Sequence, residues 1–580
     1  MQKRLFYFAI AAAVSLGSCG GGSSSNSANS PPPIANPPTT ADSVRFLLQA
    51  SFGPTDATIA EVRQKGFEQF LNQQFAAKEI GYESLPSALS PETIAGVQPA
   101  TCKNDGNRAS AASQCERDNY SIFQIQTRFF KNAIDKPDQL RQRVSWALSQ
   151  ILVVSALEIF QAYPMQSYQR ILYDNAFGNY RDILYKVTLS PAMGRYLDMV
   201  NNYKPSGTQA PNENYARELL QLFSIGQIKL NPDGSPVLEN GAPVPAYEQE
   251  QVEGFAHVFT GWTYPTMPGQ TAKFLSPAYY VGDMVVIPTR HASGAKTLLN
   301  VVTLPANQTP EKDLNDAIDN VFNHPNVAPF IGKQLIQQLV TSNPSPAYVA
   351  RVSAAFNDNG QGVRGDMKAV VRAILLDPEA RGDVKTDPRY GHLKEPALFS
   401  LNILRAMNAR SDGVIMRYFT QIMDQEIFVS PSVFNYYPPD YSLAAEKIGA
   451  PEFAIQNSST AMNRINVASS LLFNRPAYYD ATQKKYINPL PETVTGIYLD
   501  DAVNESIGTL IDWAPWQSAA ADTDGLLEKI NTLMFHGNMS AAMKGTLATA
   551  VNAVAADNPL LRARTAVFLA VTSPQYQVER

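Results

Sequence analysis

The sequence predicts a mainly α-helical protein, one large multi-helix domain that carries one or two small inserted β-hairpins. Two observations support this class. From Val44 onward, hydrophobic residues recur at the three-to-four-residue spacing of one helix face through most of the chain. Short β-branched runs gather instead between residues 263 and 305, where Tyr, Val, Thr, Pro and Gly are frequent.

The first 40 residues indicate a leader and a tether. Lys3-Arg4 precedes the apolar run Leu5 to Leu16, and the ending Leu16-Gly17-Ser18-Cys19 resembles a bacterial lipobox. An apolar run of about a dozen residues is too short to span a membrane as a stable helix. We expect a signal peptide over 1–18 and a lipidated Cys19 with a flexible Gly/Ser/Pro tether over 19–40. An ordinary secretory signal cleaved elsewhere is the alternative.

A lipid on Cys19 would make the membrane a partner of the chain. Gly20 stands where Asp would retain a lipoprotein in the inner membrane, which favours an outer-membrane lipoprotein facing the periplasm or the exterior. The net charge is −5 and no run of five or more Lys or Arg occurs. Nucleic acid is therefore not an expected partner.

Two further cysteines, Cys102 and Cys115, lie in a segment rich in Asn, Asp, Ser and Gly. An exported chain leaves the reducing cytosol, so we expect these two thiols to form one disulfide. A metal site is the alternative, but no His or further cysteine lies near them in the sequence.

The domain predicted over residues 41–580 consists mostly of helices. In 366–376 the apolar residues form one stripe, which Asp377-Pro378 ends because the residue before a proline avoids the α conformation. The same periodicity predicts the following helices: 57–77, 118–134, 138–159, 213–225, 249–260, 325–342, 366–376, 394–407, 454–473, 497–512, 539–554 and 559–572.

An irregular or β insert is predicted at about 227–305. Tyr279-Tyr280-Val281 and Val285-Val286-Ile287 flank Gly282-Asp283, a pattern typical of a hairpin. Asn240-Gly241 indicates a second small hairpin earlier in the insert.

Six segments of the sequence carry a resemblance to a known family. The longest is Pro211-Asn212-Glu213-Asn214-Tyr215-Ala216-Arg217-Glu218-Leu219-Leu220-Gln221-Leu222-Phe223-Ser224-Ile225-Gly226. The others are Arg45 to Pro54, Phe259 to Trp262, His324 to Ile331, Pro431 to Asn435 and Ser573 to Tyr576. Together and in order they resemble a large bacterial family known as domain of unknown function 1800, and the resemblance covers about 41–580.

The resemblance implies an exported protein of unassigned activity, often encoded beside a secreted protein similar to sulfatases and phosphatases. Such a protein is the expected partner. The chain departs from the family where it inserts 230–246. It also has His257 where the family commonly has Arg, and His291-Ala292 where it commonly has His-Asp.

The segment 212–218 gathers polar groups at a helix start. Asn212 can cap the helix, and Glu213 with Arg217 forms an i,i+4 pair. Asn214 and Glu218 share a neighbouring face. One hypothesis is a catalytic site with Glu218 as base or metal ligand and Arg217 as anion clamp, and with Asn212, Glu213 and Asn214 as binding residues. The competing hypothesis is a structural ion-pair network.

His291 is the third catalytic candidate, because it lies in an irregular segment after the predicted hairpin. The five histidines form no HxxxH, HxH or HExxH pattern, so no metal site is predicted from local motifs. A three-ligand site of Glu218, His257 and His291 would need the hairpin to fold back over 213–225. No phosphate loop or nucleophile elbow occurs, and the cofactor stays unassigned.

Tyr436 and Tyr437 belong to an irregular aromatic segment, residues 434–441. They are candidate binding residues for a polysaccharide or a peptide, or else part of an aromatic seam that packs loops on the helical core.

The sequence thus predicts a lipid-anchored envelope protein that acts as an accessory or scaffold to an exported enzyme or an envelope polymer. The alternative is a hydrolase or transferase that acts on a glycan, a phosphate ester or a sulfate ester through a carboxylate, arginine and histidine site.

Overall fold

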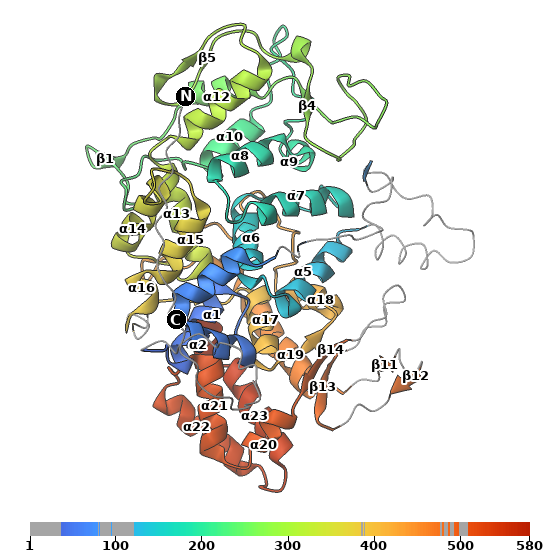
Figure 1. The fold of residues 1–580 in the computed structure, drawn as a ribbon, viewed down its shortest axis with the longest axis vertical. Coiled ribbons are helices and arrows are strands. Elements are labelled where there is room, and N and C mark those ends of the chain that lie inside the picture. The colour runs from blue at the N-terminus through green and yellow to red at the C-terminus, as the bar shows by residue number, and fades with distance from the viewer. Residues whose placement is uncertain are drawn as a thin grey trace, which may run out of the picture.

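Helix α6, Gln139–Ile151, lies near the middle of the computed structural model of the protein, with other helices on several sides of it (Figure 1). The structure describes residues 36–78, 121–383, 389–475, 492–497 and 508–580. It also describes a few isolated positions and the backbone of two short strands between 478 and 487. Cys19, Cys102 and Cys115 lie outside the described residues.

The described part of the chain confirms the mainly helical class, with 22 α-helices. They are α1 (Thr40–Ala50), α2 (Asp56–Ala76), α5 (Phe123–Asp135), α6, α7 (Ala162–Asp174), α8 (Tyr180–Leu189), α9 (Pro191–Tyr196), α10 (Asn214–Gln221), α11 (Gln249–Val258), α12 (Pro310–Phe322), α13 (Val327–Leu339), α14 (Pro346–Asn357), α15 (Met367–Leu376), α16 (Pro378–Arg381), α17 (Pro396–Ala406), α18 (Val414–Ile422), α19 (Ser458–Phe473), α20 (Ala514–Ala519), α21 (Thr523–Phe535), α22 (Ala541–Ala553), α23 (Pro559–Val571) and α24 (Pro574–Gln577).

The strands are short and antiparallel. The pairs are β1 (Leu238–Glu239) with β2 (Ala242–Pro243), β3 (Trp262–Thr263) with β4 (Val285–Val286), β5 (Lys296–Thr297) with β6 (Thr303–Leu304), β7 (His392–Leu393) with β15 (Val578–Glu579), β9 (Ser442–Leu443) with β10 (Ile448–Gly449) and β11 (Tyr478–Asp480) with β12 (Lys485–Ile487). β13 (Val494–Ile497), β14 (Thr509–Asp512) and β8 (Arg410–Ser411) form a three-stranded sheet.

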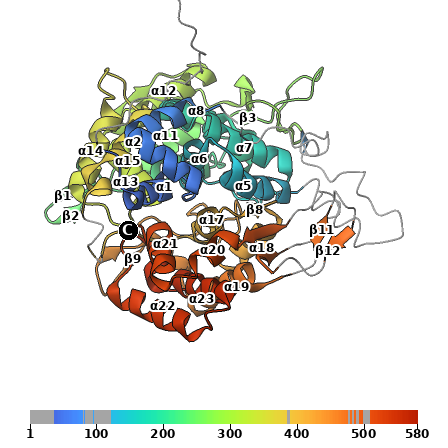
Figure 2. The ribbon, with the colours of Figure 1, turned by 60° about the horizontal axis from the view of Figure 1, so that its bottom comes forward.

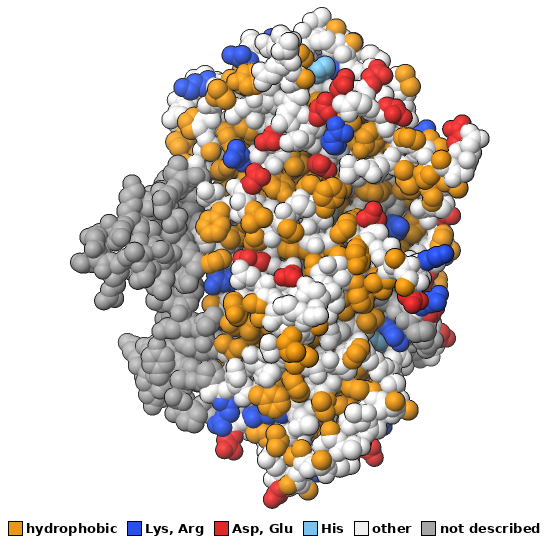
Figure 3. All heavy atoms as spheres, turned by 180° about the vertical axis from the view of Figure 1, so that it is seen from behind, with side chains coloured by type: hydrophobic (Ala, Val, Ile, Leu, Met, Phe, Trp, Pro, Cys, Tyr) orange, Lys and Arg blue, Asp and Glu red, His pale blue; other side chains and the backbone are white. Residues whose placement is uncertain are grey.

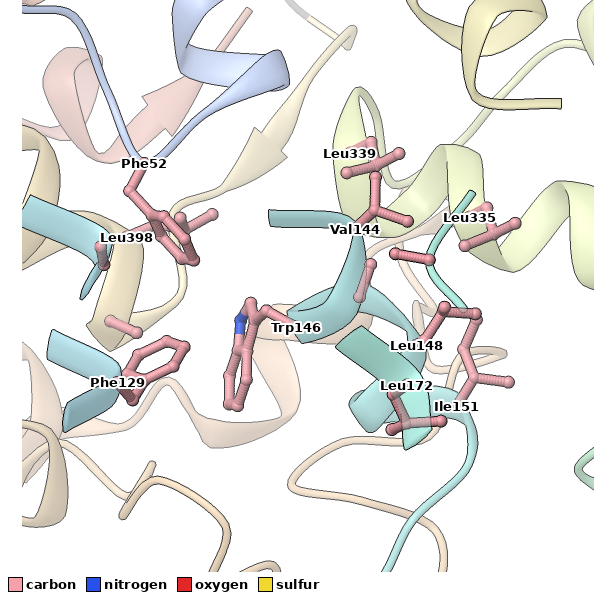
Figure 4. Packing of buried hydrophobic residues seen from close by; sticks show 14 of the residues in the cluster. Phe52, Phe129, Val144, Trp146, Leu148, Ile151, Leu172, Leu335, Leu339 and Leu398 are labelled. Carbon is pink, nitrogen blue, oxygen red and sulfur yellow. The ribbon is translucent and has the colours of Figure 1, made fainter. Parts of the chain in front are cut away.

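All 13 residues of α6 are buried, the polar ones included. Its apolar side chains point to different sides, so one helix anchors several neighbours (Figure 4). On one side, the Trp146 ring packs against Phe129, with ring centroids 4.9 Å apart. On another, Val144 lies toward Leu339 of α13 (Figure 4). Because an apolar side chain gains about 1.5–3 kcal/mol on full burial, this packing makes α6 the centre of the core.

Three helical groups surround α6. Helices α13, α14 and α15 pack on one another on one side, and α8 and α12 pack together at one end of the molecule (Figure 1). The C-terminal helices α20 to α23 form the opposite end, where the turned view shows them grouped below α1 and α2 (Figure 2). No helix in the described residues is long and apolar enough to cross a membrane.

The insert contains the small hairpin predicted at Asn240-Gly241, as β1 and β2. The other predicted pairing is wrong. Val285–Val286 pairs with Trp262–Thr263 in β3, not with the preceding tyrosines. Tyr280 packs its ring against Tyr264, with centroids 5.5 Å apart, and its backbone N–H donates to Ile94, so this stretch is held by other partners.

The helix predicted over 497–512 is also wrong where the structure describes it. Val494–Ile497 and Thr509–Asp512 are antiparallel strands that carry β-branched side chains. The Trp513 indole N–H donates to the Thr495 hydroxyl at 2.6 Å, and Thr509 bonds to Ser411 across the sheet. Apolar spacing alone did not distinguish these strands from a helix.

Several helix ends differ from prediction by a few residues, and two helices end well before the predicted residue. The helix predicted over 138–159 stops at Ile151. In the segment that follows, the Ala156 N–H donates to the Phe428 carbonyl and not to a carbonyl of the same helix. The helix predicted over 213–225 stops at Gln221, and the Ser224 hydroxyl then bonds to the Leu219 carbonyl.

Gly254 in α11 is required by close packing. An added Cβ there would lie 1.9 Å from the Thr297 carbonyl oxygen of β5. We expect Gly254→Ala to lower the free energy of unfolding by about 2–3 kcal/mol, because helix and strand must separate. Gly545 in α22 is the matched control, since its Cβ would meet no atom within 4 Å. Gly545→Ala should stabilise by up to about 1 kcal/mol. Denaturant unfolding of both variants measures the difference; equal effects would contradict this packing.

Candidate functional site

The five polar residues singled out near 212–218 lie at the start of α10. The Asn212 side-chain oxygen accepts the Asn214 backbone N–H at 2.8 Å, and α10 begins at Asn214, one residue later than expected. Asn214 in turn donates to Asp198 at 2.8 Å. Arg217 pairs with Glu213 at 2.8 Å, and the Arg217 side chain is 42% exposed. This ion pair lies at the surface, where such pairs contribute about 0.3–0.5 kcal/mol.

Glu218 differs from its neighbours on α10. Its Oε2 atom is buried and finds no hydrogen-bond partner in the described part of the chain. Burial raises the pKa of this carboxyl group, and nearby Arg217 offsets the shift only in part. The pKa of Tyr196 rises to about 12, through burial and through the Glu158 and Glu218 carboxylates. Glu218 is therefore the carboxyl group of α10 that keeps a buried oxygen without a hydrogen bond in the described structure.

His291 lies elsewhere, after the short 3-10 helix Pro288–Arg290, in a buried cluster. Its Nδ1 lies 2.9 Å from the Thr260 carbonyl and its Nε2 lies 2.8 Å from Asp313 Oδ2. The Lys296 ammonium lies 2.6 Å from the same carboxylate oxygen. Burial would raise the pKa of Asp313, but the hydrogen bonds from His291 and Lys296 outweigh it and lower that pKa.

Nε2 of His291 thus ties the insert to Asp313 of α12, while Nδ1 contacts Thr260 within the insert. His257 lies near this cluster, and its pKa is lowered by burial and by the Lys296 and His291 charges. Among the described residues, no hydrogen bond or ion pair joins the cluster to Glu218 or Arg217, and no group of three or more His, Cys, Asp or Glu is placed to hold a metal ion. The three-ligand arrangement of Glu218, His257 and His291 does not form.

Tyr436 and Tyr437 are buried beneath the loop that follows α18. The Tyr436 hydroxyl bonds to the Glu426 carbonyl and accepts the Val429 N–H at 3.2 Å. The Tyr437 hydroxyl lies 2.7 Å from Glu395 Oε2. Tyr437 thereby reaches a polar network that the sequence did not indicate.

Glu395, directly before α17, is the centre of this network and is 3% exposed. It accepts the Trp146 indole N–H at 2.6 Å and the Gln425 amide at 2.6 Å, besides its contact with Tyr437. Arg143 of α6 is fully buried nearby and donates to the Gln338 carbonyl. Its Nε and Nη1 have no hydrogen-bond partner in the described part of the chain, although the Glu395 carboxylate is near enough to act on its pKa.

His392 extends the network between two further carboxylates. Its Nδ1 lies 3.5 Å from Glu452 and its Nε2 lies 3.6 Å from Glu579. Burial disfavours the charged ring, but the two carboxylates outweigh burial and raise the pKa of His392 to about 9. The neighbouring Lys394 lies 3.7 Å from the centre of the Tyr576 ring, and burial lowers its pKa to about 8.

A small cavity of about 20 Å³, room for about one water molecule, adjoins this network. We call it the amide cavity, because side-chain amides dominate its lining. Its lining residues are Gln150 of α6, Gln334, Gln337 and Gln338 of α13, Asn435, Tyr437 and Pro439 of the 430–441 loop, and Pro451 and Glu452. Seven of these residues are buried: Gln150, Gln334, Gln337, Asn435, Tyr437, Pro451 and Glu452.

A larger groove of about 830 Å³ runs between α14 and α15. Its charges are matched within the protein. Arg351 makes two bonds of 2.7 Å to Asp377, and Arg372 lies 3.1 Å from Glu68. The groove is open, and none of its lining residues, all of them described, has a buried side-chain polar atom without a hydrogen-bond partner.

Sequence reasoning missed the network because its residues come from distant segments. Its one local signal was the abundance of Gln and Arg in 139–150. In a sequence, that composition is the same as that of a solvent-exposed helix face, so burial of α6 could not be inferred.

The fold and this interior define a class: a helical protein whose central helix is buried and takes part in a polar network beside a small, amide-lined cavity. Within that class, the chain belongs to the family described as Protein of unknown function (DUF1800), which matches residues 45–578. No curated protein and no solved structure matches the chain.

The raised pKa of His392 makes its contribution to stability depend on pH. A folded pKa of about 9 against 6.5 in the unfolded chain means that the stabilisation is complete below about pH 6.5 and is lost as the pH rises through about 9. Wild type should be more stable than His392→Gln at low pH. We expect the difference between their free energies of unfolding to fall over this pH range by an amount of the order of 3 kcal/mol.

Lys394 has the opposite effect on stability. Its lowered pKa means that the buried side chain loses its charge as the pH rises, which stabilises the folded protein. Because both proteins contain Lys394, this contribution cancels in the difference between their free energies of unfolding. Denaturant unfolding at pH 6 and pH 9.5 measures the effect. A difference that stays constant with pH would contradict the charged, carboxylate-paired histidine.

Proposed function

We propose that the protein is a lipid-anchored envelope protein that acts as an accessory or scaffold to an exported enzyme or an envelope polymer. The observation that carries this proposal is the separation of the candidate catalytic groups. Arg217 and Glu213 pair at the surface, while His291 is buried with both nitrogens bonded. A scaffold needs no convergence of these groups, whereas an active site does.

Exposed apolar side chains support a role in contact with partners. Leu157 is 64% exposed, Met462 56% and Tyr418 54%, and hydrophobic side chains are spread over the face seen in Figure 3, between scattered charges. Such side chains suit a binding surface. An exported protein similar to sulfatases or phosphatases is the partner that the family resemblance implies.

Glu218 supports the second candidate, a hydrolase or transferase acting on a glycan, a phosphate ester or a sulfate ester. A half-buried carboxyl group with a raised pKa and an unpartnered oxygen can act as a general acid or base. In this function Arg217 would serve as the anion clamp, because its side chain is exposed enough to change partners.

The anchor predicts where the protein is found. Cys19→Ser should move the protein from the membrane fraction to the soluble periplasm or the medium, because no lipid can then be attached. Fractionation followed by immunoblotting measures this change. Equal membrane retention of wild type and variant would rule out the lipid anchor.

Incubating the soluble Cys19→Ser protein with isolated, insoluble envelope polymer separates the two functions. As a scaffold, the protein should sediment with the polymer and release no soluble fragments, and adding Glu218→Gln should change neither result. Fragment release that is lost in Glu218→Gln at an unchanged melting temperature would instead establish the enzyme, because the change removes charge but keeps the side chain's shape.

A further inference from the structure

A cavity larger than the amide cavity lies between α2 and the turn that joins α5 to α6. Its volume is about 590 Å³, within the ~300–1,000 Å³ typical of ligand sites. The lining comes from the end of α1, from α2, from this turn and from Arg405 of α17. We call it the α2 cavity. Unlike the amide cavity, it has room for a small organic molecule.

Both halves of α2 line this cavity, because the helix is bent at Gly66. Gly66 has φ 77° and ψ 166°, a conformation outside the helical region that residues with a side chain rarely adopt. Thr58 and Glu61 line the cavity from the first half, and Phe70 and Gln74 line it from the second. The bend therefore brings two segments of one helix to the same cavity.

Arg405 is a buried cation in this lining and is 3% exposed. Its Nε donates to the Gly53 carbonyl at 2.7 Å, and its Nη1 donates to the Ala133 and Ile134 carbonyls at 3.0 and 2.7 Å. Nη2 takes part in none of these bonds, and no described carboxylate forms an ion pair with Arg405. Burial lowers the pKa of Arg405 to about 10. Such a group is stabilised by an anionic ligand.

Asp135 supplies a negative charge at the exposed edge of the cavity. Burial of part of this side chain raises its pKa, against the positive charges nearby. Asp135 and Arg405 act on each other's pKa but form no ion pair in the described structure, so a gap separates these two opposite charges. The other lining carboxylate, Glu61, is already paired with Lys65 at 2.7 Å.

The lining also has an apolar part. Leu47 of α1, Phe70 of α2 and Ile134 of α5 are all buried and contact the cavity. A matching ligand therefore combines a negative group, a positive group and apolar side chains. A neutral sugar lacks the charges, and inorganic phosphate lacks both the positive group and the apolar part. A short peptide with unmodified ends carries all three.

We propose that the α2 cavity binds a free dipeptide with apolar side chains, whose carboxylate contacts Arg405 and whose ammonium group contacts Asp135. Nη2 of Arg405 offers two N–H donors to the carboxylate. The ends of an extended dipeptide lie about 7 Å apart, so the ligand can bridge two charges that are too far apart to pair directly. This inference goes beyond the proposed function and does not depend on it.

Calorimetric titration of the soluble Cys19→Ser protein tests the proposal. The probes are leucyl-leucine, its carboxyl-terminal amide, and N-acetyl-leucyl-leucine. We expect leucyl-leucine to bind about tenfold more tightly than the amide, because the amide cannot pair with the buried Arg405. It should bind about threefold more tightly than the acetylated probe, because an ion pair with the exposed Asp135 contributes less.

Asp135→Asn on this background removes the proposed partner of the ammonium group. It should weaken binding of leucyl-leucine by about threefold and leave the affinity for N-acetyl-leucyl-leucine unchanged. The matched control is Asp557→Asn, an exposed aspartate that does not line the cavity, which should change neither affinity.

A second variant tests the cavity without removing a charge. Ala76 is exposed at the end of α2 and lines the cavity, so the indole of Ala76→Trp should fill part of it and weaken leucyl-leucine binding by about tenfold. Ala57→Trp is the matched control, because Ala57 is exposed on the same helix but does not line the cavity. Arg405 is left unchanged because its three bonds to carbonyls hold α17 in place.

Four results would overturn the proposal: no binding of any probe, equal affinity for leucyl-leucine and its amide, full affinity in Ala76→Trp, or the same loss in Ala57→Trp. Equal affinity for leucyl-leucine and N-acetyl-leucyl-leucine would also overturn it. That result would indicate the carboxyl terminus of a longer chain as the ligand, since such a chain has no ammonium group near its last residue.

Discussion

The burial of α6 is the constraint on which the rest of the structure depends. A helix whose 13 residues all face the interior brings its Arg, Gln and Ser side chains away from water. Those groups must find partners inside the protein, since an unpaired buried polar group costs about 1–3 kcal/mol and a buried charge more. Glu395 meets part of this demand through Trp146, next to the buried charge of Arg143.

The partners of α6 come from segments far apart in the chain. Asn435 donates to Gln150, and Glu395 precedes α17. At the same interior, Arg45 donates to the Arg580 carbonyl, which places the first described helix beside the last strand. Two of the segments that resemble the family, 45–54 and 431–435, thus supply residues that hydrogen-bond to distant parts of the chain.

The network leaves several buried polar atoms without a hydrogen-bond partner among the described residues, Arg143 Nε and Nη1 included. Glu395 and Tyr437 are saturated with partners, whereas Gln334 and Gln337 each keep a free polar atom at the amide cavity. On α10 the Arg217–Glu213 ion pair is exposed to solvent and therefore weak. The buried polar atom without a hydrogen bond on this helix is Glu218 Oε2.

The sequence by itself determined the helical class, the family and many of the helices, because the 3.6-residue apolar period and local stops such as Asp377-Pro378 act within a few residues. It also determined the pairing of Glu213 with Arg217, which needs only i,i+4 spacing. Tertiary structure alone decided that β4 pairs with β3, that α6 is buried, and that His392 lies between Glu452 and Glu579. These contacts join residues tens to hundreds of positions apart, so no local spacing encodes them.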